Sequence, residues 1–111
     1  MPKILEQQYD LSTGETEVVS INYSDVLDSG ELLSGTPTVS EVSTSNLTLA
    51  NKLVNTATYV ESFSGETISI GKAVQFTVTT GTAGLYQIRV TVSTDSTPTR
   101  TLVRDLYLRF I

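Results

Sequence analysis

The chain has 111 residues, a length that suits one domain built around one hydrophobic core. It contains no cysteine and no histidine, so it can form no disulfide and lacks the side chains that most hydrolytic triads and most zinc sites use. Its formal net charge is −5 and its seven Lys and Arg are scattered, which disfavours nucleic-acid binding.

The first 16 residues are polar, show no clear period and end in the turn signal Ser12-Thr13-Gly14-Glu15. We predict an N-terminal arm over residues 1–16 and a folded domain over 17–111. A frayed terminus is one interpretation of the arm, and a strand added to the open sheet edge of a neighbouring molecule is the other. The apolar side chains that would anchor the arm on a partner are Ile4, Leu5, Tyr9 and Leu11.

Short runs rich in β-branched and aromatic residues follow, and they are typical of strands. We expect strands over 17–23, around Val39 and Val42, over 47–50, over 53–60 and over 67–70. The turn signals between them are Ser24-Asp25, Asp28-Ser29-Gly30, Gly35-Thr36-Pro37, Ser64-Gly65-Glu66 and Gly71-Lys72.

The last third of the chain alternates most clearly between apolar and polar residues. The alternation predicts strands over 73–79, 85–93 and 101–111, each with one buried face. Arg104 is the one charged residue on the otherwise apolar face of the final strand. We expect it either to reach water near the end of the strand or to pair across an interface with a partner.

Many short strands separated by turns, with no helical period, indicate an all-β fold: an immunoglobulin-like antiparallel β-sandwich of about seven to eight strands with an extended N-terminal arm. Gly81 and Gly84 frame a tight connection, and Tyr86 opens the strand after it. In such sandwiches a tyrosine at this place bonds back to nearby backbone, the tyrosine corner. We prefer that role for Tyr86 over a plain core aromatic, and we predict a structural role for Tyr23.

Acidic and basic side chains offer few candidates for chemistry. Asp25, Asp28 and Glu31 are spaced three apart, but this spacing matches no calcium loop, and a solvated turn is the preferred interpretation. No pattern brings two carboxylates together as an acid–base pair. Arg100, Arg104 and Arg109 near the last strand would protect a sheet edge or dock an acidic partner. We expect no catalytic residue, no cofactor, no metal and no nucleic-acid partner.

Three segments carry a resemblance to a known family. Residues 17–31 contain a strand followed by a Ser-Asp pair and a Gly-Glu turn, residues 81–92 contain Gly-Thr-Ala-Gly and an alternating strand, and Arg100-Thr101 leads into the last strand. Together they resemble small immunoglobulin-like virion proteins of tailed bacteriophages, described as fibre–tail adaptors or head–tail proteins. The chain departs from that family at Tyr23 and Val26, where the family has tryptophan, and residues 36–70 match nothing closely.

The resemblance implies a non-enzymatic structural protein of the virion that joins neck or tail components or attaches fibres, in symmetric multi-copy contact with other virion proteins. A capsid decoration protein is the alternative within the virion, and a carbohydrate-binding or adhesion module is the alternative outside it. Residues 1–8 contain no apolar h-region, and no apolar run approaches about 18 residues. We therefore expect synthesis in the host cytoplasm, no membrane contact and a final location in the virion.

Overall fold

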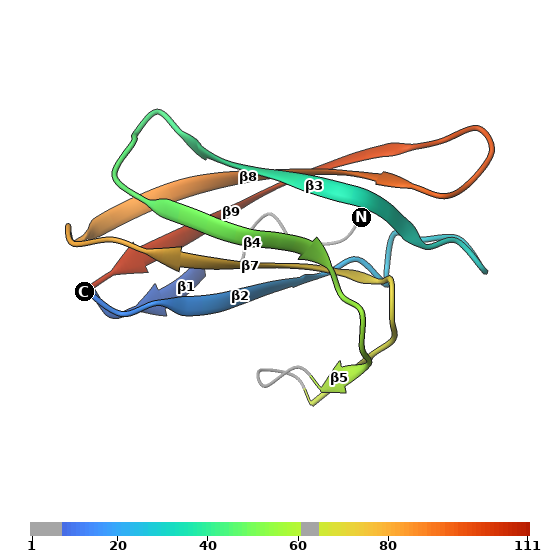
Figure 1. The fold of residues 1–111 in the computed structure, drawn as a ribbon, viewed down its shortest axis with the longest axis horizontal. Coiled ribbons are helices and arrows are strands. Elements are labelled where there is room, and N and C mark those ends of the chain that lie inside the picture. The colour runs from blue at the N-terminus through green and yellow to red at the C-terminus, as the bar shows by residue number, and fades with distance from the viewer. Residues whose placement is uncertain (1–7, 61–64) are drawn as a thin grey trace.

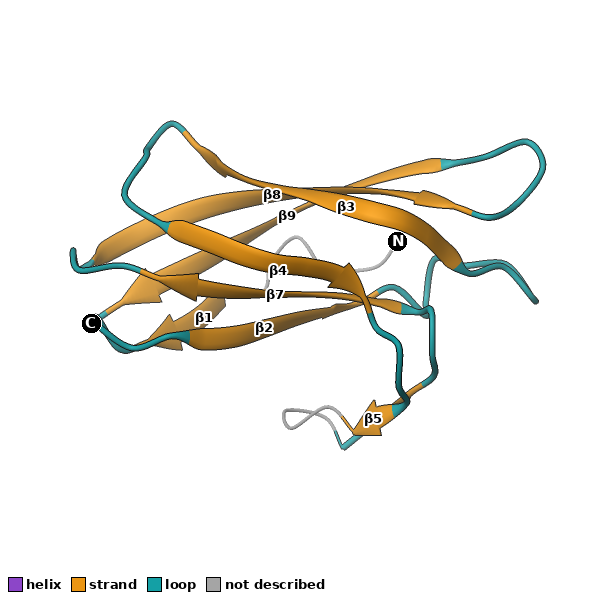
Figure 2. Cartoon of the chain, viewed as in Figure 1, coloured by secondary structure: helices purple, strands orange, loops and turns teal. Residues whose placement is uncertain are grey.

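The computed structural model describes residues 8–60 and 65–111, and strands are the only regular elements in that part of the chain (Figure 2). The strands are β1 (Gln8–Leu11), β2 (Glu17–Asn22), β3 (Leu33–Val42), β4 (Thr48–Val54), β5 (Tyr59–Val60), β6 (Thr67–Ile68), β7 (Ala73–Thr79), β8 (Gly84–Thr94) and β9 (Thr101–Phe110). The predicted anchors Ile4 and Leu5 lie outside the described residues.

Two sheets pack face to face, one with the strand order β1-β9-β8-β3 and the other with the order β2-β7-β4 (Figure 1). Matching β2, β3, β4, β7, β8 and β9 with strands B, C, D, E, F and G of the immunoglobulin fold turns these orders into B-E-D and C-F-G. The fold is therefore the immunoglobulin-like sandwich that the strand periods predict. Its pairs are antiparallel except for β1 and β9, which run parallel.

The core fills the space between the sheets and follows the predicted alternation. In β7, Val74, Phe76 and Val78 point inward and are buried, while the residues between them are half-buried on the outer face. Tyr86 and Phe110 meet in the core edge to face, with ring centroids 5.9 Å apart. The other buried apolar side chains of the core come from both sheets and include Val19, Ile21, Tyr23, Leu33, Val39, Ile88, Val90, Val92, Leu102, Leu106 and Leu108.

Part of the predicted arm belongs to this chain's own sheet. Residues 8–11 form β1 beside β9, in a register that pairs Gln8 with Tyr107 and Leu11 with Phe110. Leu11 is half-buried and packs against the core, so it is not available as an anchor on a neighbour. The strand escaped prediction because four residues are too few to show a period of two.

Two segments differ from the predicted strands and turns. Gly35-Thr36-Pro37 is a bulge inside β3, not a turn between strands, because the register with β8 shifts between Ser34 and Thr38. The predicted strand over 53–60 is interrupted after Val54, where the chain leaves the sheet to form the β5–β6 hairpin, which extends away from the sandwich (Figure 1).

The base of that hairpin is closed by Asn55, which is buried. Its side-chain amide donates to the carbonyls of Ala57 (3.0 Å) and Ser69 (2.9 Å). Its side-chain oxygen accepts hydrogen bonds from the backbone N–H groups of Lys72 (3.0 Å) and Ala73 (2.9 Å). One side chain thus joins the start of the hairpin to the start of β7.

Candidate functional site: the loop end of the sandwich

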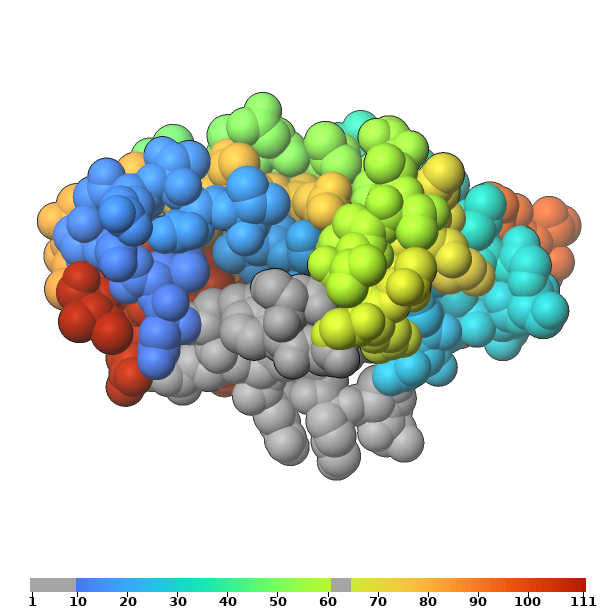
Figure 3. Space-filling view, turned by 90° about the horizontal axis from the view of Figure 1, so that it is seen from below, coloured from blue at the N-terminus to red at the C-terminus, as the bar shows by residue number. Residues whose placement is uncertain are grey.

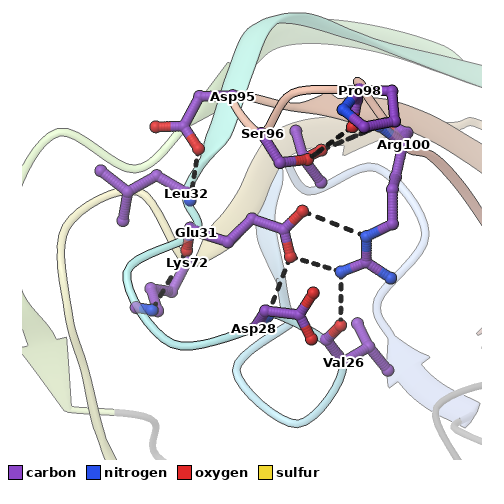
Figure 4. Close-up of polar contacts among 10 residues, drawn as sticks. Val26, Asp28, Glu31, Leu32, Lys72, Asp95, Ser96, Pro98 and Arg100 are labelled. Atoms are coloured by element: carbon purple, nitrogen blue, oxygen red, sulfur yellow. Dashed lines mark hydrogen bonds and ion pairs between the residues drawn. The ribbon is translucent and has the colours of Figure 1, made fainter.

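The β2–β3 connection and the β8–β9 turn meet at one end of the sandwich, which we call the loop end (Figure 4). Glu31 lies in the first connection and Arg100 ends the second. The guanidinium of Arg100 donates through Nε to Glu31 Oε2 (3.1 Å) and through Nη2 to Glu31 Oε1. The same Nη2 donates to the carbonyl of Val26 (2.9 Å), so one arginine holds two points of the β2–β3 connection.

Glu31 is buried, with 4% of its surface exposed, and this corrects the prediction of a solvated turn for this residue. Asp25 and Asp28 are exposed, as a turn requires. Sequence separation explains the error, because the arginine that permits burial of the carboxylate lies 69 positions away. No group of three or more metal-ligating side chains forms among residues 8–60 and 65–111.

The charge on Glu31 is strongly favoured. Hydrogen bonds from Arg100 first, and then from the Asp28 backbone (2.8 Å) and nearby hydroxyls, hold the pKa of Glu31 far below its usual range. The hydrogen bonds that Arg100 donates to Glu31 in turn raise the pKa of Arg100. A carboxylate that stays ionised and fully engaged is a poor general acid or base, so this pair is suited to holding structure.

Further bonds tie the two connections together. The backbones of Leu32 and Asp95 are linked by an Asp95 N–H to Leu32 C=O bond (2.9 Å), and the Asp95 carboxylate accepts from the Leu32 N–H (2.9 Å). The ammonium of Lys72, just before β7, donates to the Glu31 carbonyl (3.3 Å). Within the β8–β9 turn, the Thr94 hydroxyl accepts a hydrogen bond from the Arg100 N–H (3.0 Å) and closes the turn. The loop end is therefore fixed by bonds between segments that are far apart in sequence.

Arg104 lies inside β9 and is buried. The sequence interpretation in which it reaches water near the end of the strand is therefore wrong. Arg104 is 8% exposed, its guanidinium carbon lies 5.7 Å from the centre of the Tyr23 ring, and its Nη1 donates to the Val103 carbonyl (2.9 Å). Burial raises the pKa of Tyr23, and the nearby Arg104 opposes that shift. The Tyr23 hydroxyl has no hydrogen-bond partner among the described residues.

The sequence predicted that Arg100, Arg104 and Arg109 protect a sheet edge. This prediction is wrong, because β9 lies between β1 and β8 and is not an edge strand. Arg100 joins the loop end and Arg104 covers Tyr23. Arg109 makes two bonds to Asp10 of β1, at 3.1 and 3.0 Å. All three arginines therefore have contacts within this chain.

The predicted structural positions around Tyr86 lie at the opposite end of the sandwich from the loop end. The Tyr86 hydroxyl donates to the Thr82 carbonyl (2.8 Å), which is the geometry of a tyrosine corner. Gly81 lies in the turn before β8, and Gly84 is the first residue of that strand.

Tyr9 belongs to β1, where it pairs with Leu108 in the register of the sheet.

No family model matches the chain, and no curated protein matches it. Among solved structures, the chain is similar to the ASH / PapD-like domain of human CEP192 (PapD-like domain 7), with 16% sequence identity and a TM-score of 0.43. The similarity covers 98% of this chain and 82% of that one. The described residues contain no helix long and apolar enough to cross a membrane.

Proposed function

We propose that this chain is a non-enzymatic structural protein of a tailed-phage virion and that it binds other virion proteins through its loop end. The observation that carries the binding role is the ion pair between the buried Glu31 and the partly exposed Arg100, which fixes two connections against each other. A surface that is ordered before a partner arrives loses less conformational entropy on docking. The phage assignment is supported by the sequence resemblance over residues 17–31, 81–92 and 100–101.

The exposed side chains at the loop end suit contact with a protein. Leu32 of the loop end is 37% exposed, Ile70 beside Gly71 is 53% exposed, and the Asp95 carboxylate accepts a hydrogen bond from the Leu32 N–H. Gly71 packs so closely on Leu32 that a Cβ at position 71 would lie 3.2 Å from Leu32 Cδ2. Apolar groups held on such a rigid base, with charges at the rim, are typical of protein-binding surfaces.

An adaptor in a virion requires a binding surface that forms identically in every copy, and this sandwich has one. Contacts in a virion repeat around a symmetry axis, so modest contacts per copy sum to a firm attachment. The loop end is held by one ion pair and by hydrogen bonds, and a chain without cysteine forms this surface whatever the redox state.

The test is the copy number of this chain in purified virions, measured relative to the major capsid protein by quantitative peptide mass spectrometry. About 6–12 copies per particle would match a ring-symmetric neck or tail position and support the adaptor role. Hundreds of copies would contradict it and favour capsid decoration. Absence from clean particles would overturn the virion assignment, and binding to a panel of soluble glycans would then favour a carbohydrate-binding module.

A further inference from the structure

Arg104 is a cation inside the sandwich that no anion of the described chain neutralises. It is 8% exposed, and its neighbours on the inward face of β9 are the buried apolar side chains of Leu102 and Leu106. Each ion pair among residues 8–60 and 65–111 involves one of the other arginines. A guanidinium that has left water without meeting an anion is costly to keep in a fold, so its place in β9 calls for an explanation.

The contacts of the guanidinium leave it short of hydrogen-bond acceptors. Its Nη1 donates to the Val103 carbonyl (2.9 Å), but its buried Nε has no partner in the described part of the chain. The Tyr23 ring, whose centre lies 5.7 Å from the guanidinium carbon, attracts the charge without accepting that N–H. The Tyr23 hydroxyl is itself buried and lacks a partner among the same residues. Both unpaired groups are able to donate, so the group missing here is an acceptor.

The pairing of β9 decides from which side an acceptor can reach Arg104. On one side β8 pairs with β9 over residues 101–110, whereas on the other side β1 pairs only with residues 107–110. Arg104 therefore lies before the point at which β1 begins to cover β9. Figure 3 shows this side of the sandwich, with β2 in blue and the C-terminal end of β9 in red. Tyr23 directly follows β2, so the two unpaired donors come from the strands on this side of both sheets.

We infer that Arg104 binds a carboxylate of a partner protein, an aspartate or glutamate side chain that enters on the β1 side of β9. The guanidinium carries one positive charge, which one carboxylate neutralises. A phosphate monoester carries about two negative charges and would leave one of them unpaired inside the sandwich. A carboxylate also accepts from two N–H groups of one guanidinium at once, so it supplies the acceptor that Nε lacks.

The net charge of −5 does not prevent this pairing. Repulsion between exposed charges is screened over about 8 Å at physiological ionic strength, whereas a pair formed inside the sandwich is screened much less. The other three arginines of the chain, Arg89, Arg100 and Arg109, already hold carboxylates of this chain. Arg104 is therefore the arginine that is left to take an anion from a second molecule.

The test is the melting temperature of the full chain, followed by circular dichroism at about pH 7, in sodium acetate and in sodium chloride, each at about 0.2 M. Acetate replaces the carboxylate of the partner, and a dissociation constant of about 10 mM is expected for one charged, hydrogen-bonded pair. The difference between the two salts should then be about 5 °C larger for the unchanged chain than for Arg104→Met. The matched control is Arg109→Met, which removes an exposed pair with Asp10 and should keep the full difference.

Nuclear magnetic resonance of the unchanged chain tests the same site without a substitution. The Nε–H signal of Arg104 should move as acetate is added and should stop moving once the site is full. The Nε–H signal of Arg89, which already donates to Asp105 (2.9 Å), is the internal control and should stay in place. An Arg104 signal that does not move, or that moves no more than the Arg89 signal, would overturn the inference. An equal acetate effect on the melting temperature of all variants would overturn it as well.

A carboxylate of a protein is distinguished from a small free carboxylate by two capped peptides, acetyl-Val-Glu-Val-amide and its glutamine counterpart. At equal concentration the glutamate peptide should move the Arg104 signal further than acetate does, and the glutamine peptide should leave it in place. Acetate that binds as tightly as the glutamate peptide would overturn the assignment to a partner protein. The inference goes beyond the proposed function, and its tests use the purified chain. Because no result depends on the copy number in virions, failure here and failure of the proposed function are distinguishable.

Discussion

At the residue scale, the contrast between Glu31 and Tyr23 shows what decides whether a buried polar group stabilises a fold. Both are buried, but Glu31 has partners on both carboxylate oxygens, whereas the Tyr23 hydroxyl has none among the described residues. A buried polar group stabilises a protein only when its bonds replace those it made to water. The two residues therefore predict opposite responses to removal of the polar group.

Replacement of Glu31 by Gln should destabilise the protein at neutral pH and flatten its response to acid. The folded state holds the pKa of Glu31 below its unfolded value of about 4.3, so the pair stabilises the fold above that pH, and the contribution is lost as the pH falls toward the folded pKa. Urea unfolding at about pH 7 and about pH 2.5 measures the difference. Asp25→Asn, in an exposed turn, is the control and should leave both values nearly unchanged; an equal effect of the two variants would contradict the prediction.

Tyr86→Phe and Tyr23→Phe form a matched pair of hydroxyl deletions in the same core. Tyr86→Phe removes the bond to the Thr82 carbonyl and should cost about 1 kcal/mol of stability. Tyr23→Phe removes a buried hydroxyl that has no partner among residues 8–60 and 65–111, and it should be neutral or stabilising by up to about 1 kcal/mol. Thermal unfolding followed by circular dichroism checks both, and a larger loss with Tyr23→Phe would mean that its hydroxyl is bonded in solution.

At the scale of elements, the strands predicted best are those whose alternation is uninterrupted; β3 is equally long, but its bulge between Ser34 and Thr38 hid its first half. β7, β8 and β9 alternate over 7 to 11 residues, and the sequence predicts them nearly to their ends. β1 has only four residues and is positioned by its parallel pairing with β9, which lies near the C-terminal end of the sequence. Pairing that depends on distant strands leaves no local signal, so neither β1 nor the bond between Glu31 and Arg100 could be predicted from a single sequence.

The β5–β6 hairpin is the element most dependent on one residue. Asn55→Ala would remove four side-chain hydrogen bonds and leave buried backbone groups unpaired, at a cost of about 2–4 kcal/mol. Amide hydrogen exchange should become faster in residues 55–60 and 65–72 and change little in β8 and β9. Asn46→Ala, at an exposed position where the backbone makes the hydrogen bonds, is the control. Uniform acceleration over the whole chain would instead mean that Asn55 supports the sandwich globally.

At the scale of the whole molecule, the composition and the strand periods are enough to predict the sandwich and the place of the tyrosine corner. They predict less about how its surfaces differ. The charged pairs Arg89–Asp105 and Arg109–Asp10 on one outer face arise from the register between strands, which sequence alone does not supply. The proposed role of the loop end could likewise be argued only once distant segments were brought together.

The parallel pairing of β1 with β9 has a practical consequence for experiments on this protein. It brings Leu11 beside Ile111, whose N–H donates to the Leu11 carbonyl (2.9 Å), and it leaves Ile111 at the end of the 41 Å long axis opposite the loop end (Figure 1). An affinity tag, a fluorophore or a sensor-chip tether attached after Ile111 would therefore lie at the far end of the molecule from the loop end. Immobilised in this way, the protein can serve as bait for its partners without its binding surface being blocked.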